Sequence, residues 1–204
     1  GGGADQEQGI LSKDLVQYTE NIKDAVNNGV FFLLICGAYQ LFGKYYKDAE
    51  GNVIPGLNVF DYYTEALADR KKRCIGNIVI NANLNGKETK IIGFENHGGQ
   101  TFDIDTPFGD VLFGNGNKFG DTKEGFFKDN VIATYLHGPL LSKNPELADY
   151  IIKYCLDRKY NEDIQLEQLD DSFENLCREQ LLHRFLDNRR LRCTCRWHSI
   201  HCLF

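Results

Sequence analysis

The apolar run from Val30 to Ile35 constrains the fold of this chain more than any other segment. It reads Val-Phe-Phe-Leu-Leu-Ile, has the length of a β-strand, and is not interrupted by a polar residue. Strands of a parallel sheet are buried on both faces and therefore read as continuous apolar runs. The run thus predicts a central parallel strand, and parallel strands need long crossovers, usually helical, to connect them.

Helices are expected on both sides of this strand. Before it, apolar residues recur at spacings of three and four, and Asn28-Gly29 is a typical helix end. After it, Cys36-Gly37-Ala38 forms a tight turn, and residues 39–46 read as the next helix. Helix, strand, tight turn and helix in this order predict a doubly wound α/β domain of the flavodoxin or Rossmann type. The recurring apolar positions are Leu11, Leu15, Tyr18, Ile22 and Val26.

Later segments add strands and helices to this framework. Residues 75–82 and 90–94 read as strands joined by the hairpin turn Asn85-Gly86, and residues 98–125 contain only short strands. Residues 131–136 form a second apolar, β-branched run that ends at His137. Asn144-Pro145-Glu146 is a strong helix start, and residues 171–186 favour a last helix. The buried stripe expected after Asn144 consists of Leu147, Tyr150, Ile151, Tyr154 and Cys155.

The composition agrees with one ordinary domain and argues against several classes of protein. The chain has 204 residues, of which 42% are hydrophobic, enough for a packed core. The net charge of −6 and the lack of a basic stripe argue against a nucleic-acid partner. No apolar run is long enough for direct insertion into a membrane as a helix. Seven cysteines without framework spacing indicate reduced thiols, so we expect a cytoplasmic protein.

The two ends of the chain are unusual. There is no methionine, and the sequence opens on Gly1-Gly2-Gly3, a glycine run that would normally follow a strand. We therefore expect an α/β domain over residues 1–186 that lacks its N-terminal strand. Residues 187–204 differ in composition and are expected to form an atypical tail. The Cys and His residues of this tail suit zinc, but they crowd together without the paired spacing of zinc sites, which favours an accidental tail.

Cys36 lies where the apolar strand turns into a helix, a position suited to a nucleophile. Such a turn exposes the sulfur above the sheet, and the start of the helix directs backbone N–H groups toward it. These groups are expected to lower the thiol pKa and can hold a developing oxyanion. Gly37 leaves room for a substrate to approach the backbone. Cys36 is therefore the candidate nucleophile, and the alternative is a buried structural cysteine.

A cysteine nucleophile in acyl transfer needs an acid or base within hydrogen-bond reach. His137 ends a predicted buried strand, at the edge of the sheet where α/β active sites form. His97 follows another predicted strand, in the segment Glu95-Asn96-His97-Gly98-Gly99, and is a rival. A histidine in such a loop can equally serve to shape a pocket. The position of His137 at the end of a predicted buried strand favours it over His97 as the base.

The turn Ile35-Cys36-Gly37-Ala38-Tyr39-Gln40 resembles the nucleophile turn of the class I glutamine amidotransferases, Cys-x-Gly-x-Gln. Other segments are similar to the GatD-type branch, which is related to the glutaminase domains of cobyric acid synthases. Together these segments run in the family's order over about residues 1–160. They comprise residues 1–8, 36–44, 75–80, 93–99, 134–140 and 143–145. The resemblance implies a class I glutamine amidotransferase domain.

The resemblance also implies roles for individual residues. Cys36 would be the nucleophile and His137 the general acid/base. Arg73 would bind the α-carboxylate of glutamine, unless extra residues in the basic loop shift that match to Arg70. The remaining positions implied are Gly2 and Gly3 for a second oxyanion donor, Gly37 beside the substrate, and Gln40 in support of the turn.

Two positions depart from the family's common pattern. Pro139 stands two residues after His137, where the common triad has an acid, so a dyad or an acid from elsewhere is expected. Ala38 replaces a second glycine after the nucleophile and could crowd the turn.

GatD-type proteins hydrolyse L-glutamine and pass ammonia to a MurT-like Mur ligase, and the resemblance implies the same heterodimer here. The partner uses ATP and Mg²⁺ to amidate the D-glutamate of lipid II to D-isoglutamine in peptidoglycan synthesis. No metal or organic cofactor is implied for the glutaminase half-reaction. The alternatives are a stand-alone cysteine hydrolase, a cobyric-acid-type amidotransferase and an inactive fragment.

Overall fold

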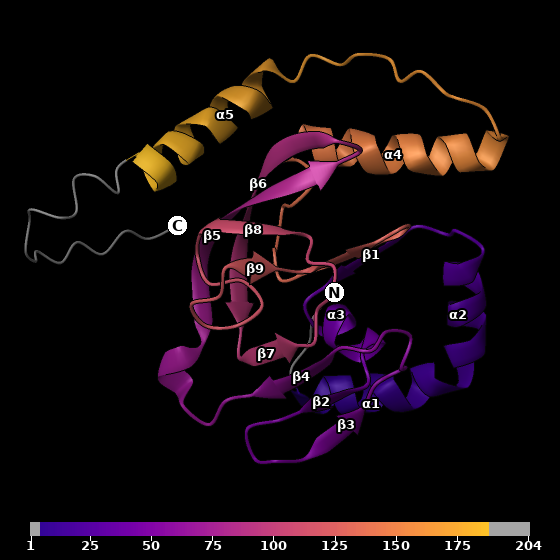
Figure 1. The fold of residues 1–204 in the computed structure, drawn as a ribbon, viewed down its shortest axis with the longest axis vertical. Coiled ribbons are helices and arrows are strands. Elements are labelled where there is room, and N and C mark those ends of the chain that lie inside the picture. Colours follow the sequence, from indigo (N-terminus) through magenta and orange to yellow (C-terminus); the bar gives the residue numbers. More distant parts are fainter. Residues whose placement is uncertain (1–4, 188–204) are drawn as a thin grey trace, which may run out of the picture.

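The computed structural model describes residues 5–187, which form three small sheets accompanied by helices (Figure 1). The strand orders are β1-β11-β10, β3-β2-β4-β7 and β6-β5-β8-β9. This mixture of helices and sheets confirms the α/β class. The strands are β1 (Phe32–Ile35), β2 (Tyr45–Lys47), β3 (Val53–Pro55), β4 (Tyr63–Ala66), β5 (Cys74–Leu84), β6 (Lys87–His97), β7 (Gly99–Phe102), β8 (Gly109–Phe113), β9 (Lys123–Glu124), β10 (Phe126–Lys128) and β11 (Val131–Thr134). The helices are α1 (Asp5–Leu15), α2 (Thr19–Asn27), α3 (Gly37–Phe42), α4 (Pro145–Tyr160) and α5 (Ser172–Leu182), with short 3₁₀ or π turns η1 (Val16–Tyr18), η2 (Arg70–Lys72) and η3 (His183–Asp187).

The helical segment before β1 is interrupted, where one continuous helix was predicted. The 3₁₀ turn η1 separates α1 from α2. Leu15, Ile22 and Val26 pack against a buried cluster as predicted, but Leu11 and Tyr18 are exposed. A 3₁₀ turn has three residues per turn instead of 3.6, so it rotates the apolar stripe out of line.

The predicted parallel strand is confirmed, but its place in the sheet differs. β1 runs parallel to β11, with Phe32 opposite Val131 and Ile35 opposite Thr134. Among residues 5–187 the central strand is β11, because it also pairs with β10, whereas β1 pairs with β11 alone. Leu34 is the buried residue of β1, and its neighbours in the strand stay partly accessible. Because β1 and β11 run in the same direction, the segments that follow them leave the sheet at the same edge.

The helix after Cys36 is shorter than predicted. α3 ends at Phe42 and the chain then enters β2, where a helix to residue 46 was expected. At Gly43 the backbone passes so close to the next segment that a Cβ would lie 2.6 Å from the carbonyl oxygen of Tyr62. The Lys44 N–H donates to that same oxygen (2.8 Å), so pairing with a distant segment replaces the helix.

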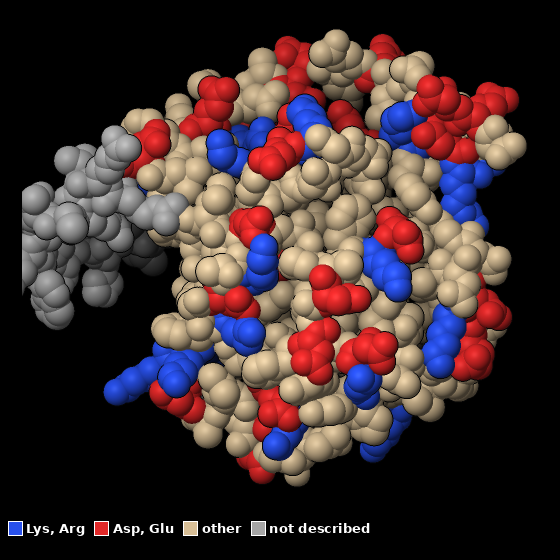
Figure 2. Space-filling view, in the orientation of Figure 1, with Lys and Arg blue, Asp and Glu red and all other residues tan. Residues whose placement is uncertain are grey.

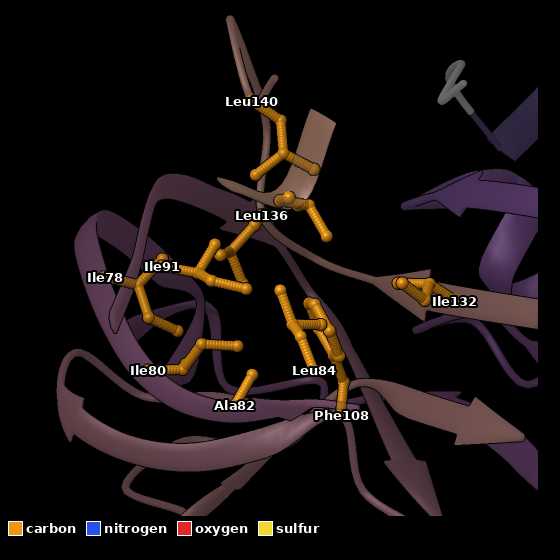
Figure 3. Packing of buried hydrophobic residues seen from close by; sticks show 10 residues of the cluster. Ile78, Ile80, Ala82, Leu84, Ile91, Phe108, Ile132, Leu136 and Leu140 are labelled. Atoms are coloured by element: carbon orange, nitrogen blue, oxygen red, sulfur yellow. The ribbon is translucent and has the colours of Figure 1, made fainter. Parts of the chain in front are cut away.

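The hairpin of β5 and β6 dominates the middle of the chain. Its eleven-residue strands pair in register from Cys74 opposite His97 to Leu84 opposite Lys87. Both residues of the predicted turn Asn85-Gly86 have positive φ, 51° and 85°, as such a turn requires. Both strands are longer than predicted. Figure 3 shows the core where this hairpin meets the end of β11, formed by Ile78, Ile80, Ala82, Leu84, Ile91, Phe108, Ile132, Leu136, Leu140 and Leu147.

The helix start at Pro145 is confirmed, but its neighbours act differently from the prediction. Asn144 makes no side-chain cap, and instead its amide bonds to both the N–H and the C=O of Ile92 in β6 (2.8 Å each). Leu147 is fully buried, whereas Cys155 is exposed, contrary to the predicted stripe. Cys155 lies eight residues after Leu147, about 80° around the helix from it.

The surface carries both signs of charge. Figure 2 shows Lys and Arg side chains interspersed with Asp and Glu over the visible face. No helix within residues 5–187 combines the length and the apolar character needed to cross a membrane.

Candidate active site

Cys36 occupies a strained turn between β1 and α3. Its φ of 54° and ψ of −106° are unusual for a residue with a side chain, and such conformations cost about 1–3 kcal/mol. Hydrogen bonds on both sides hold it in place. Its N–H donates to the Thr134 carbonyl of β11 (2.9 Å), and its carbonyl accepts from the Gln40 N–H (3.0 Å). The neighbouring strand and the first turn of α3 therefore hold the Cys36 backbone in place.

The surroundings of the Cys36 thiol raise its pKa, the opposite of the direction predicted from the sequence. Partial burial disfavours the thiolate, and this effect outweighs the Gly37 N–H and the Arg73 guanidinium, which both favour it. α3 has only six residues, so few peptide dipoles add up at its start. The thiol therefore needs a base to deprotonate it near neutral pH.

A pocket of about 390 Å³ opens beside the sulfur. Cys36, Gln40 and Arg73 all line it, and so does the rival histidine His97. Arg73 donates from Nε and Nη2 to Asn96 Oδ1, at 3.2 and 3.0 Å, which holds the guanidinium at the pocket wall. A pocket of this size with a fixed cation suits a small molecule that carries a carboxylate.

Gln40 extends from α3 into a buried polar network. Its Nε2 donates to the Tyr135 hydroxyl (3.3 Å), and that hydroxyl also shares a hydrogen bond with Thr101 Oγ1 (2.7 Å). Gln40 Oε1 is buried and has no hydrogen-bond partner among residues 5–187. Gly99 approaches the amide so closely that a Cβ there would lie 2.6 Å from Gln40 Nε2. Together with the backbone bond to Cys36, this network places Gln40 in contact with the turn and with the core beneath it.

His137 follows β11 at the edge where Cys36 follows β1. Its N–H donates to the Phe94 carbonyl (2.8 Å) and its carbonyl accepts from the Phe94 N–H (3.3 Å), so the backbone of β6 fixes it. Burial lowers the pKa of the ring. His137 Nε2 is buried without a hydrogen-bond partner in the described part of the chain. His137 is not among the described residues that line the pocket, so the structure unites Cys36, Gln40 and Arg73 there and places His137 on the adjacent strand end.

His97 is more deeply buried than His137 and does line the pocket. Its ring stacks on Tyr135, with centroids 3.6 Å apart and an interplanar angle of 5°. Nδ1 lies 2.7 Å from the Gly99 carbonyl, which can only accept, so Nδ1 carries the proton. Burial lowers the pKa of His97 to about 4, which keeps the ring neutral at pH 7. These contacts favour the pocket-shaping role that the sequence left open.

Some expected site residues lie outside the part that is described. Gly2, Gly3 and the Cys/His-rich segment from residue 188 onward are outside residues 5–187. Of the two arginines considered for substrate binding, Arg73 lines the pocket, and Arg70 begins η2. Tyr135 and Thr101 were not predicted as site residues. Tyr135 interrupts the apolar run of residues 131–136 with a hydroxyl group, which was an available signal, whereas Thr101 lies in β7, whose sequence Gly-Gln-Thr-Phe offered none.

Comparison with known proteins identifies the family of this chain. The model of the CobB/CobQ-like glutamine amidotransferase domain matches residues 1–145, so the predicted domain end at residue 186 stays a prediction. Subunit GatD of lipid II isoglutaminyl synthase (glutamine-hydrolyzing) from Staphylococcus aureus is 39% identical over 184 residues, 90% of this chain and 73% of that protein. GatD from Streptococcus pneumoniae is 43% identical over 173 residues, 84% of this chain and 65% of that protein. A probable cobyric acid synthase from Methanococcus vannielii is 32% identical over 171 residues, 79% of this chain but 33% of that protein. The chain therefore belongs to the CobB/CobQ-like family of glutamine amidotransferases.

Proposed function

We propose that the chain is the cytoplasmic, glutamine-hydrolysing subunit of a two-subunit amidotransferase, with Cys36 as nucleophile and His137 as general acid/base. The observation that carries this proposal is the strained strand-to-helix turn of Cys36, which opens into a pocket that also contains Arg73. The similar GatD proteins are subunits of lipid II isoglutaminyl synthase by name. The partner would be a MurT-like Mur ligase that uses ATP and Mg²⁺ to convert the D-glutamate of lipid II to D-isoglutamine.

L-Glutamine matches the chemistry of the pocket. Its α-carboxylate would pair with the Arg73 guanidinium, whose planar fork suits two parallel hydrogen bonds. Its side-chain amide would then face Cys36, which lines the same pocket. The volume of about 390 Å³ lies within the range of small-ligand pockets, about 300–1,000 Å³. Gln40 contributes by holding the Cys36 turn.

The reaction would proceed through a thioester. His137 takes the Cys36 thiol proton, and the thiolate attacks the amide carbon while backbone N–H groups, that of Gly37 included, hold the oxyanion. His137 gives the proton to the leaving nitrogen, so the C–N bond breaks and ammonia departs. His137 then takes a proton from water, whose oxygen forms a bond to the thioester carbon. The C–S bond breaks, the thiolate regains its proton, and glutamate leaves. The lowered pKa of His137 keeps its ring neutral and ready to accept a proton at pH 7.

Labelling with a glutamine-mimicking diazoketone, followed by intact-mass measurement, tests the nucleophile. We expect one adduct on the wild-type protein and none on the Cys36→Ala variant. The matched control is Cys155→Ser, which changes an exposed cysteine and should label like the wild type. Folded wild-type protein that forms no adduct, alone or with the Mur-ligase-like partner, would refute the proposed activity.

Glutamine hydrolysis with and without the partner separates a subunit from a stand-alone hydrolase. A subunit that feeds ammonia to a partner is expected to hydrolyse glutamine faster in its presence. Equal rates in both preparations would contradict the two-subunit proposal and leave the stand-alone cysteine hydrolase.

A further inference from the structure

Three side chains with metal-binding atoms lie together on one face of the β5–β6 hairpin. Cys74 is directly opposite His97 in the antiparallel register, and Glu95 precedes His97 by two residues, so it shares that face. One sulfur, one carboxylate oxygen and one imidazole nitrogen from these residues lie within 4.8 Å of one another. Each side chain is at most 2% exposed. The hairpin register therefore builds a compact set of donor atoms shielded from water.

His97 presents a lone pair to this cluster. Because Nδ1–H donates to the Gly99 carbonyl, Nε2 of the neutral ring carries no proton. Nε2 is buried, lacks a hydrogen-bond partner among residues 5–187, and lies 4.0 Å from Glu95 Oε2. Buried polar atoms normally have a partner, and two acceptors that face each other call for a proton or a cation between them.

The groups behind these atoms are arranged like the outer shell of a metal site. Metal-binding histidines generally donate their second ring nitrogen to a carbonyl or carboxylate, as His97 does to Gly99. Glu95 Oε1 accepts from the backbone N–H and from Nδ2 of Asn115 (2.9 and 2.8 Å), and Oε2 accepts from the Gly116 N–H (3.1 Å). The imidazole and the carboxylate are thus both held in fixed orientations.

We propose that Cys74, Glu95 and His97 bind one Zn²⁺ ion. A set of sulfur, imidazole nitrogen and carboxylate oxygen suits zinc, with water as the fourth ligand of a tetrahedral site. Zinc–ligand bonds of about 2.0–2.3 Å place ligand atoms about 3.5 Å apart, so the three donors must close by about 1 Å.

The proton and charge balance of this site is straightforward. Zinc binds cysteine as the thiolate, so the metal displaces the Cys74 thiol proton, which passes to water. The resulting thiolate and the Glu95 carboxylate together neutralise the two positive charges of the ion. The ion would clamp the end of the hairpin from which Arg73 and its partner Asn96 reach the substrate pocket.

Metal titration of the full chain tests the site. Because the C-terminal segment contains further thiols, the parent protein is a Cys193→Ser, Cys195→Ser, Cys202→Ser variant, stripped with a chelator. After titration with zinc and gel filtration, we expect the stripped parent protein to retain one equivalent of zinc, measured by mass spectrometry. Cobalt in place of zinc should give a near-ultraviolet thiolate-to-cobalt charge-transfer band. Absence of one-to-one binding by this folded parent would overturn the proposal without any further variant.

Substitutions of the proposed zinc ligands provide the second test of the site. Cys74→Ser and His97→Gln, made in the same parent, are expected to abolish the charge-transfer band and to weaken zinc binding at least 10-fold. Cys155→Ser, at an exposed position on α4, is the matched control and should bind like the parent. Unchanged zinc binding in both site variants would assign the metal elsewhere and overturn the proposal. Diazoketone labelling of Cys36 is scored separately, so the two proposals can fail independently.

Discussion

Replacing Glu124 with Gln should remove a large part of the pH dependence of stability. Glu124 is fully buried in β9, and burial raises the pKa of its carboxyl to about 8. Its Oε1 accepts from the Tyr135 N–H (2.7 Å), and Oε2 lies 2.9 Å from Thr134 Oγ1. A protonated carboxyl satisfies both contacts, since Oε1 accepts while the Oε2 hydroxyl donates to Thr134. The amide of Gln offers the same acceptor and donor without titrating.

The direction of this pH dependence follows from the pKa of Glu124, which is higher in the folded protein than in the unfolded chain. Folded Glu124 keeps its proton up to about pH 8, whereas the unfolded chain loses it near its ordinary pKa of 4.5. The contribution to stability is therefore complete below pH 4.5 and is lost as the pH rises to 8. At about 1.4 kcal/mol for each pKa unit, the loss amounts to at most about 5 kcal/mol.

Urea unfolding followed by circular dichroism at pH 5, 6.5 and 8 measures this effect. We expect the free energy of unfolding of the wild type to fall relative to Glu124→Gln as the pH rises. Other titrating groups are shared by both proteins, so they cancel in the difference. A difference that stays constant from pH 5 to pH 8 would show that Glu124 is ionised in the folded protein, which refutes the reasoning.

Three further perturbations test the site and its support. Arg73→Ala is expected to raise the KM for glutamine about 10- to 100-fold, because charge-assisted hydrogen bonds contribute about 1.5–3 kcal/mol. The KM of Arg73→Lys should lie between the values of the wild type and Arg73→Ala. An unchanged KM of Arg73→Ala in steady-state kinetics would contradict substrate binding by Arg73. Alkylation of Cys36 by iodoacetamide should still accelerate above pH 9, because burial raises the thiol pKa, and a plateau below pH 8 would contradict this. Gly93→Ala should lower the free energy of unfolding by about 1–3 kcal/mol, since its Cβ would lie 2.7 Å from Leu136 Cβ, and wild-type stability in urea would argue against that clash.

The elements predicted correctly are those specified by local patterns. The strand after residue 30, the hairpin turn Asn85-Gly86 and the helix start at Pro145 each follow from periodicity or turn chemistry within a few residues. Two of the predicted helices differ in the structure, one where a distant segment intervenes and one where a 3₁₀ turn interrupts the helical segment. Pairing with the Tyr62 carbonyl ended α3 early, and the break at η1 turned Tyr18 to solvent.

By itself, the sequence determined the α/β class, the strand-to-helix turn at Cys36 and the resemblance to glutamine amidotransferases, because these depend on residues that are adjacent in the chain. Only the tertiary structure decided that Arg73 and His97 share a pocket with Cys36. It also reversed the expected direction of the Cys36 thiol pKa. Strand register and long-range packing determine which residues line the pocket, how deeply they are buried, and that Cys74 lies beside His97. The spacing of residues along the chain does not specify which distant side chains shield one another from water.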